Sequence, residues 1–173
     1  MPLHQGALDG LCGPYAITNS FELLGYDDVD AVFRTACRAL AQRRWPEAIW
    51  EGTTLGDMQR MIKACRTNLP DANCISVSYP FMRSTPATHA AYWERFDEIF
   101  TDESVVCGIV GISKPSDHWI VVSREGNRLM FTDTDPHQPS VRKNKKSLYA
   151  GKHRQWPTQW QLESNELIVF STT

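Results

Sequence analysis

The stretch from Ser104 to Ile112 constrains the fold of this chain most, because it is apolar at odd and even positions alike. An extended strand of this kind is buried on both faces, so the stretch predicts a central strand of a sheet. Helical patterns dominate the chain before it, and strand patterns dominate the chain after it. We therefore expect an α+β protein in which a helical part is followed by a sheet.

The length and composition are typical of an ordinary globular protein. The chain has 173 residues, 42% of them hydrophobic and 22% charged, which is enough to bury a substantial core. It contains no repeat, low-complexity segment or linker that would divide it, so we expect one domain over residues 1–173. A formal net charge of −2 gives no indication of nucleic-acid binding.

The five cysteines lack the regular spacing of a disulfide framework, and none forms a short pair with another cysteine or a histidine. This pattern favours a reducing compartment, and we predict no metal site and no cofactor. The first residues show no basic and apolar leader pattern, and no apolar run approaches membrane-spanning length. We expect a cytoplasmic protein, or one exported without a standard signal peptide, with no membrane partner.

Cys12 stands at the start of a predicted helix, directly before Gly13 and Pro14. Pro14 favours a first helical turn, because its φ is already helical and its missing N–H has no intrahelical partner there. Gly25 ends the helix, and its apolar positions recur at helical spacing: Ile17, Phe21 and Leu24. A helix N-terminus favours an anion, and the thiolate is the reactive form of cysteine. We interpret Cys12 as a candidate nucleophile at the accessible end of its helix.

Most free cysteines in proteins are buried packing residues without chemistry. We interpret the other four in that way: Cys37, Cys65, Cys74 and Cys107. The same interpretation is the alternative for Cys12, so a catalytic role for it requires a base and a group that orients the base.

Three local patterns in the first hundred residues give further expectations. Trp45 to Gly52 is predicted to be a loop that carries two tryptophans. Thr54 to Asp57 resembles a capping box that opens a short amphipathic helix. Thr85-Pro86 is predicted to begin another helix, because a capping residue precedes a proline.

A β-hairpin is predicted from His118 to Asp133, and its register decides which acid meets the histidine. If Glu125-Gly126 is the two-residue loop, His118 faces Asp133. If Gly126-Asn127 is the loop, His118 faces Asp135. Directly opposed side chains have Cβ atoms about 4.5–5.5 Å apart, so either register brings a carboxylate to the imidazole.

A carboxylate beside a histidine fixes its tautomer and stabilises the imidazolium, which is what a Cys–His pair needs from a third member. We favour Asp133 over Asp135, because the alternating apolar residues of the strand end at Asp133. A purely structural pair of His118 and an acid is the alternative. Gln5, seven residues before Cys12, is a candidate for the oxyanion hole, where a side-chain amide and a backbone N–H can donate together.

These residues, in this order, resemble the papain-like fold of cysteine peptidases: Gln5, Cys12-Gly13-Pro14, His118 opening an apolar strand, and Asp133 after the next strand. More narrowly, the chain is similar to the C39-like branch, whose best-known members cleave double-glycine leader peptides. The resemblance implies helices first and an antiparallel sheet after them. It also implies that Gln5 lines the oxyanion hole, Cys12 attacks, His118 is general base and acid, and Asp133 orients His118.

The function expected on this basis is a cysteine peptidase that hydrolyses a peptide or isopeptide bond through a Cys–His–Asp triad and an acyl-enzyme. A glutamine deamidase or transglutaminase is the alternative that would use the same residues, as some bacterial effectors and toxins with this fold do. The alternative from another class is a catalytically silent interaction module that binds through the basic segment Ser140–Arg154. The expected partner is a protein or peptide substrate, and a regulatory or inhibitory partner protein is left open.

Overall fold

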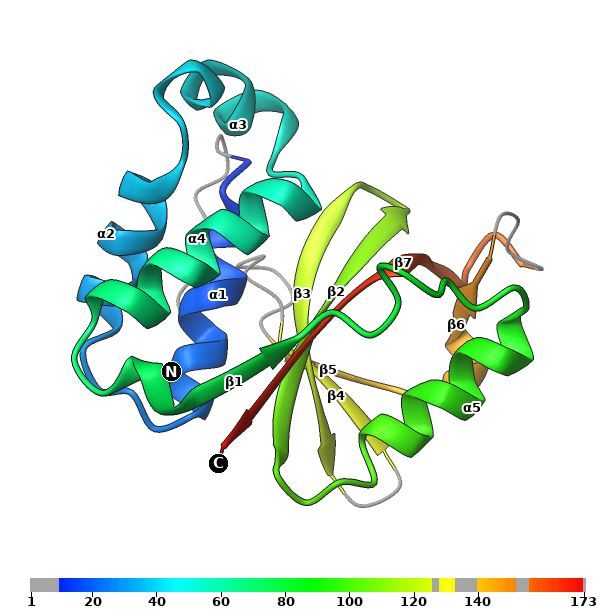
Figure 1. The fold of residues 1–173 in the computed structure, drawn as a ribbon. Coiled ribbons are helices and arrows are strands. Elements are labelled where there is room, and N and C mark those ends of the chain that lie inside the picture. Colours follow the sequence, from blue (N-terminus) through cyan, green and yellow to red (C-terminus); the bar gives the residue numbers. More distant parts are fainter. Residues whose placement is uncertain (1–9, 126–127, 133–139, 152–155, 173) are drawn as a thin grey trace.

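The computed structural model describes residues 10–125, 128–132, 140–151 and 156–172 (Figure 1). Its helices are α1 Cys12–Leu23, α2 Val29–Ala39, α3 Trp45–Glu51, α4 Leu55–Asn68 and α5 His89–Ile99, with 3-10 turns at Gln42–Arg44, Ala72–Cys74 and Lys145–Ser147. Its strands are β1 Ile75–Ser78, β2 Val105–Lys114, β3 His118–Glu125, β4 Arg128–Thr132, β5 Ser140–Lys143, β6 Leu148–Ala150 and β7 Trp160–Thr172. The first part is mainly helical and the second mainly strand, as predicted.

The strands of the described chain form one sheet in the order β1-β7-β2-β3-β4-β5, and β6 pairs with β7 outside this path. The pairings along the path are antiparallel, whereas β6 runs parallel to β7. β2 lies inside the sheet, and its residues from Cys107 to Ile112 are all buried. The prediction of a central strand is confirmed.

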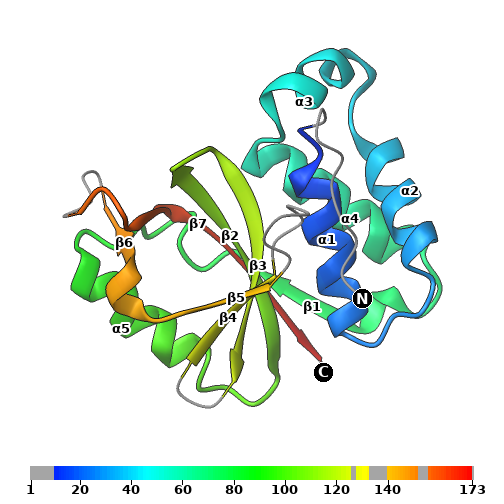
Figure 2. The ribbon, with the colours of Figure 1, turned by 180° about the vertical axis from the view of Figure 1, so that it is seen from behind.

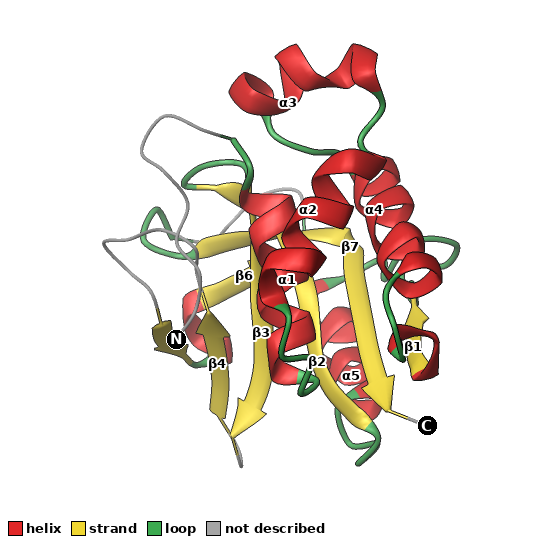
Figure 3. Ribbon diagram, turned by 90° about the vertical axis from the view of Figure 1, so that its left-hand side faces the viewer, coloured by secondary structure: helices red, strands yellow, loops and turns green. Residues whose placement is uncertain are grey.

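The sheet carries a hydrophobic core on each face. Helices α1, α2 and α4 lie on one side of it and α5 lies on the other (Figures 1 and 3). Neighbouring residues of β2 point to opposite faces, so Ile109 belongs to the core under α1 and Val110 to the core under α5. The view from behind shows the same separation (Figure 2). The stretch is apolar at odd and even positions because helices cover both faces of the sheet.

Helix α1 has the boundaries that the sequence indicates. It begins at Cys12, and Pro14 lies in its first turn. Gly25 has a φ of 83°, which favours glycine, and its N–H donates to the carbonyl of Glu22. The N–H of Tyr26 donates to Phe21 O, which completes the C-terminal cap.

Two local predictions are wrong. Residues 45–51 form helix α3 instead of a loop, because a proline stands in its first turn and Glu47 complements its N-terminus. Only Ala48 of this helix is buried, so it lacks the apolar periodicity that would reveal it. Helix α5 begins at His89 with Thr88 as its cap, since the hydroxyl of Thr85 donates instead to Phe81 O.

The hairpin of β3 and β4 has one of the two predicted registers. Val122 pairs with Phe131, and Glu125 pairs with Arg128. This is the register that leaves Gly126-Asn127 between the strands.

Candidate active site

Cys12 is the first residue of α1 and lies against a cavity of about 330 Å³. Its side chain is only 5% exposed, so it is more buried than an accessible helix end suggests. Its Sγ lies 3.8 Å from the carbonyl oxygen of Gly10. The first turn of α1 thus presents its thiol to this cavity.

His118 lines the same cavity from the start of β3. The turn before it contains a cis Lys114–Pro115 peptide bond. The remaining wall comes from three places: the end of α3 with its connection to α4, the end of β2 with the turn that leads to His118, and the first half of β7. The fold therefore brings together the thiol and the imidazole that the sequence analysis paired.

Close packing around two glycines holds the start of α1 in place. A Cβ atom on Gly13 would lie 2.1 Å from Thr53 Oγ1 and 2.7 Å from Met58 Sδ, so only glycine fits there. The N–H of Gly10 donates to Ile49 O at 2.6 Å, which ties the approach to α1 to helix α3. Sequence analysis gave these glycines no such role, because their neighbours come from a different part of the chain.

Thr53, in the cavity wall, contacts both the helical part and the sheet of the protein. Its carbonyl accepts a hydrogen bond of 2.7 Å from the indole N–H of Trp119, the residue after His118. Both side chains are buried. This bond joins the start of β3 to the loop before α4 and so fixes the histidine strand relative to the cysteine helix.

The loop is also anchored by the start of α4. Thr54 and Asp57 form the predicted capping box, and Arg44 donates to the Asp57 carboxylate at 3.2 Å. Burial opposes ionisation of Asp57, but the hydrogen bonds from Thr54 and Arg44 outweigh it and lower the pKa of its carboxyl group. The capping-box prediction is confirmed.

Carboxylates dominate the charge of the cavity. Glu51, Asp117, Glu163 and Glu166 line it together with Cys12 and His118. Burial, together with the nearby charges of Glu163 and Asp117, raises the pKa of Glu166 from the usual value of 4.5 to about 7. The cavity is therefore suited to a positively charged group.

A bulge in β7 places two of these acids. Val110 of β2 pairs with Leu167 and Ile112 pairs with Leu162, so residues 163–166 stand opposite Gly111 alone. A Cβ on Gly111 would lie 2.0 Å from Glu166 Oε2, which shows that the glycine makes room for this carboxylate. Bulges of this kind redirect side chains beside functional sites. Sequence analysis missed Glu163 and Glu166, because a bulge leaves no clear signal in a polar strand segment.

Comparison with known proteins bears on the fold. No protein-family model and no curated protein matches the chain. Among solved structures it is similar to the peptidase domain of Streptococcus ComA, described as a bifunctional ABC transporter involved in quorum sensing, with a TM-score of 0.54 and 14% identity. The match covers 99% of this chain and 97% of that one. The chain has the fold of this peptidase domain. The predicted α+β class is confirmed, and the expectation of a C39-like peptidase is supported at the level of fold.

Two predicted site residues of this peptidase-like fold, Gln5 and Asp133, lie outside the described residues, as does the alternative Asp135. The described hairpin has the register for which we expect Asp135, and not Asp133, opposite His118. The roles of these three residues stay predictions.

The other cysteines differ in their surroundings. Cys65 and Cys107 are buried packing residues, and burial raises the pKa of each thiol to about 12. Cys37 is half-buried. Cys74 is exposed, so its interpretation as a buried packing residue is wrong; its thiol donates to the carbonyl of Asp71 at the surface.

The described part of the chain has neither a metal-binding cluster nor a membrane-spanning helix. No three histidine, cysteine or acidic side chains there converge as a metal ion requires. No helix there combines the length and the apolar character needed to cross a membrane.

Proposed function

We propose that this protein is a cysteine hydrolase that cleaves peptide or isopeptide bonds, with Cys12 as nucleophile and His118 as general base and acid. The observation that carries the proposal is that Cys12 and His118, from distant parts of the chain, line one cavity. The fold of a peptidase domain supports it. A helix N-terminus beneath the thiol favours the negative charge that the nucleophile needs.

In this mechanism His118 takes the proton of Cys12, and the thiolate attacks the carbonyl carbon of the scissile amide. Backbone N–H groups at the start of α1, with the Gln5 amide, are the proposed donors to the oxyanion. His118 then gives its proton to the leaving amine, the C–N bond breaks, and a thioester remains. Water, deprotonated by His118, attacks the thioester, which releases a carboxylic acid and restores the thiol. Asp133 or Asp135 is the proposed group that orients His118.

The charge of the cavity gives an expectation about the substrate. Four acidic side chains line the cavity with the thiol and the imidazole within the described residues, so a lysine or arginine side chain beside the scissile bond is favoured over an acidic one. The same cavity would accept the glutamine side chain that a deamidase or transglutaminase acts on, because the first acyl-transfer step is shared.

The first test is the rate at which iodoacetamide labels Cys12 between pH 5 and pH 9, about two units to either side of neutrality, where an activated thiolate and an ordinary thiol differ most. Mass spectrometry identifies the labelled residue, and the exposed Cys74 serves as the internal reference. We expect Cys12 to react faster than Cys74 below neutral pH and to lose this advantage in His118→Ala. Equal rates at the two thiols would overturn the enzyme proposal in favour of a silent interaction module.

A second experiment separates the possible reactions. The protein is incubated with lysine-rich and glutamine-containing peptides, with Cys12→Ala as the matched control. We expect cleaved peptides from the wild type and none from the variant. Intact peptides in which glutamine has become glutamate would indicate the deamidase instead. Asp133→Ala and Asp135→Ala are compared in the same assay, and the larger loss of kcat identifies the residue that orients His118.

A further inference from the structure

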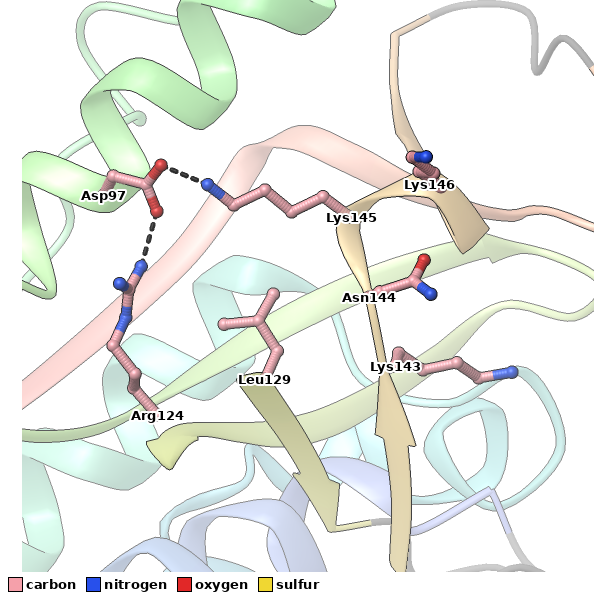
Figure 4. A pocket seen from close by; sticks show the side chains of 7 residues that line it. All are labelled: Asp97, Arg124, Leu129, Lys143, Asn144, Lys145 and Lys146. Carbon is pink, nitrogen blue, oxygen red and sulfur yellow. Dashed lines mark hydrogen bonds and ion pairs between the residues drawn. The ribbon is translucent and has the colours of Figure 1, made fainter. Parts of the chain in front are cut away.

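A second cavity, of about 510 Å³, lies on the α5 side of the sheet (Figure 4). Its walls come from α5, the end of β3, the start of β4, and the segment from β5 into the 3-10 turn after it. Four cationic side chains and a single carboxylate line it: Arg124, Lys143, Lys145, Lys146 and Asp97. We refer to these five residues as the basic cavity. Its charge is opposite to that of the cavity at Cys12.

Asp97 organises two of the cations. It lies between Lys145 and Arg124 and forms an ion pair with each (Figure 4). Burial opposes ionisation of Asp97, but the hydrogen bonds from Lys145 and Arg124 outweigh it and lower the pKa of its carboxyl group. A lysine has three N–H donors and an arginine has five, so this carboxylate positions both groups while it occupies only a minority of their donors.

The positive charge of the basic cavity is not balanced by the described residues. Arg124 Nε is buried and has no hydrogen-bond partner among them. Lys143 places its ammonium 4.2 Å from the centre of the Trp160 ring, which orders the side chain without neutralising it. Lys146 is exposed, and no carboxylate of the described chain lies within ion-pair distance of it. An unsatisfied buried donor and uncompensated cations are both relieved by an anionic ligand.

We propose that the basic cavity binds a compact polyanion, namely the di- or triphosphate group of a small molecule. The cavity has the volume of a small-molecule site. Its cations come from two strands and a turn that lie around one hollow, which suits a dense anion better than an extended acidic chain. Guanidinium and ammonium groups together are the usual ligands of phosphate oxygens in proteins.

This proposal does not depend on the proposed peptidase activity. His118 and Arg124 stand near opposite ends of β3, which places the two cavities about 20 Å apart at 3.3 Å per residue. A ligand in the basic cavity therefore leaves the space around Cys12 open. The binding test below uses no reaction at Cys12, so its failure and the failure of the peptidase proposal are distinguishable.

The test is calorimetric titration of the full chain with inorganic tripolyphosphate at low ionic strength. The variant is Lys143→Gln/Lys146→Gln, and the control is Lys63→Gln, which removes an exposed lysine of α4 on the other side of the sheet. We expect saturable binding by the wild type and the control, and at least about tenfold weaker binding by the double variant, since each removed cation loses a charge-assisted contact. Equal binding by the wild type and the double variant, or no binding by the wild type, would overturn the proposal.

Further measurements identify the ligand and distinguish a loss of binding from a loss of folding. Lys146→Gln alone changes only an exposed side chain, and an affinity about threefold weaker with an unchanged Tm would support the proposal. A nucleoside triphosphate that binds more tightly than tripolyphosphate would assign the phosphates to a nucleotide, and weaker binding would assign them to a smaller compound. A hexaglutamate peptide that binds as tightly as tripolyphosphate would overturn the proposal in favour of an acidic protein partner.

Discussion

At the scale of single residues, the candidate active site depends on a glycine next to the nucleophile. Gly13→Ala would place a methyl group 2.1 Å from Thr53 Oγ1 and 2.7 Å from Met58 Sδ. We expect the first turn of α1 to move, with a loss of about 1–3 kcal/mol in the free energy of unfolding and slower labelling of Cys12. Urea unfolding and the iodoacetamide assay measure the two effects.

Gly56→Ala is the matched control for this prediction. Gly56 lies in α4, and the nearest atom to an added Cβ there is Thr54 Oγ1 at 3.8 Å. Alanine should stabilise the helix by about 0.5–1 kcal/mol, because glycine is the poorer helix former. Equal losses in both variants would show that the tight packing at Gly13 is not what matters.

Glu166 gives the site a dependence on pH. Burial, followed by the charges of Glu163 and Asp117, raises the pKa of Glu166 from 4.5 to about 7 in the folded protein. A carboxyl group with a raised pKa contributes stability that is fully present below pH 4.5 and is lost as the pH rises through about 7. Glu166→Gln should therefore raise the Tm at pH 8, about one unit above that pKa, and leave it unchanged in acid. Glu98→Gln, an exposed residue of α5, should change neither value.

At the scale of elements, the sequence predicted the helices and hairpins whose formation depends on residues close together in the chain. The helix that begins at Cys12 follows from Pro14 and the apolar spacing, and the β3–β4 hairpin follows from alternation and a short loop. The acids at Glu163 and Glu166 could not be predicted, since a bulge against β2 places them and its register depends on a distant strand. Helix α3 was missed because it buries only Ala48.

The capping box of α4 is expected to stabilise the loop that walls the cavity. Asp57→Asn removes an ionised side chain that accepts hydrogen bonds from Thr54 and Arg44, at a cost of about 1–2 kcal/mol near neutral pH. Because its pKa is lowered in the folded state, the stabilisation is present above pH 3.8 and is lost as the pH falls below that value. Unfolding curves of both proteins should therefore converge in strong acid.

Asp30→Asn serves as the comparison for this element. Asp30 pairs with Arg34 on the surface of α2, where both side chains are more than half exposed. Its removal should cost no more than about 0.5 kcal/mol. A cost at Asp30 as large as the cost at Asp57 would contradict the importance assigned to the capping box.

At the scale of the whole molecule, charge is divided between the two faces of the sheet. Acids line the cavity with Cys12, and cations line the basic cavity under α5. For the proposed peptidase we expect kcat/KM for a lysine-flanked peptide to exceed that for a glutamate-flanked one, by about tenfold for a difference of about 1.4 kcal/mol. Glu163→Gln should reduce the ratio, as should added salt. The same ratio in both proteins would show that the acids do not select the substrate.

The position of β7 has a consequence for when the site can form. This strand, drawn in red in Figure 1, lies between β1 and β2 and also supplies Glu163 and Glu166 to the cavity. A nascent chain that has emerged from the ribosome only as far as β5 holds Cys12 and His118 but lacks the strand that joins β1 to β2. Such a chain cannot close its sheet, because long-range strand pairing waits for the last partner. For the proposed hydrolase we therefore expect no activity until β7 has been translated and has joined the sheet.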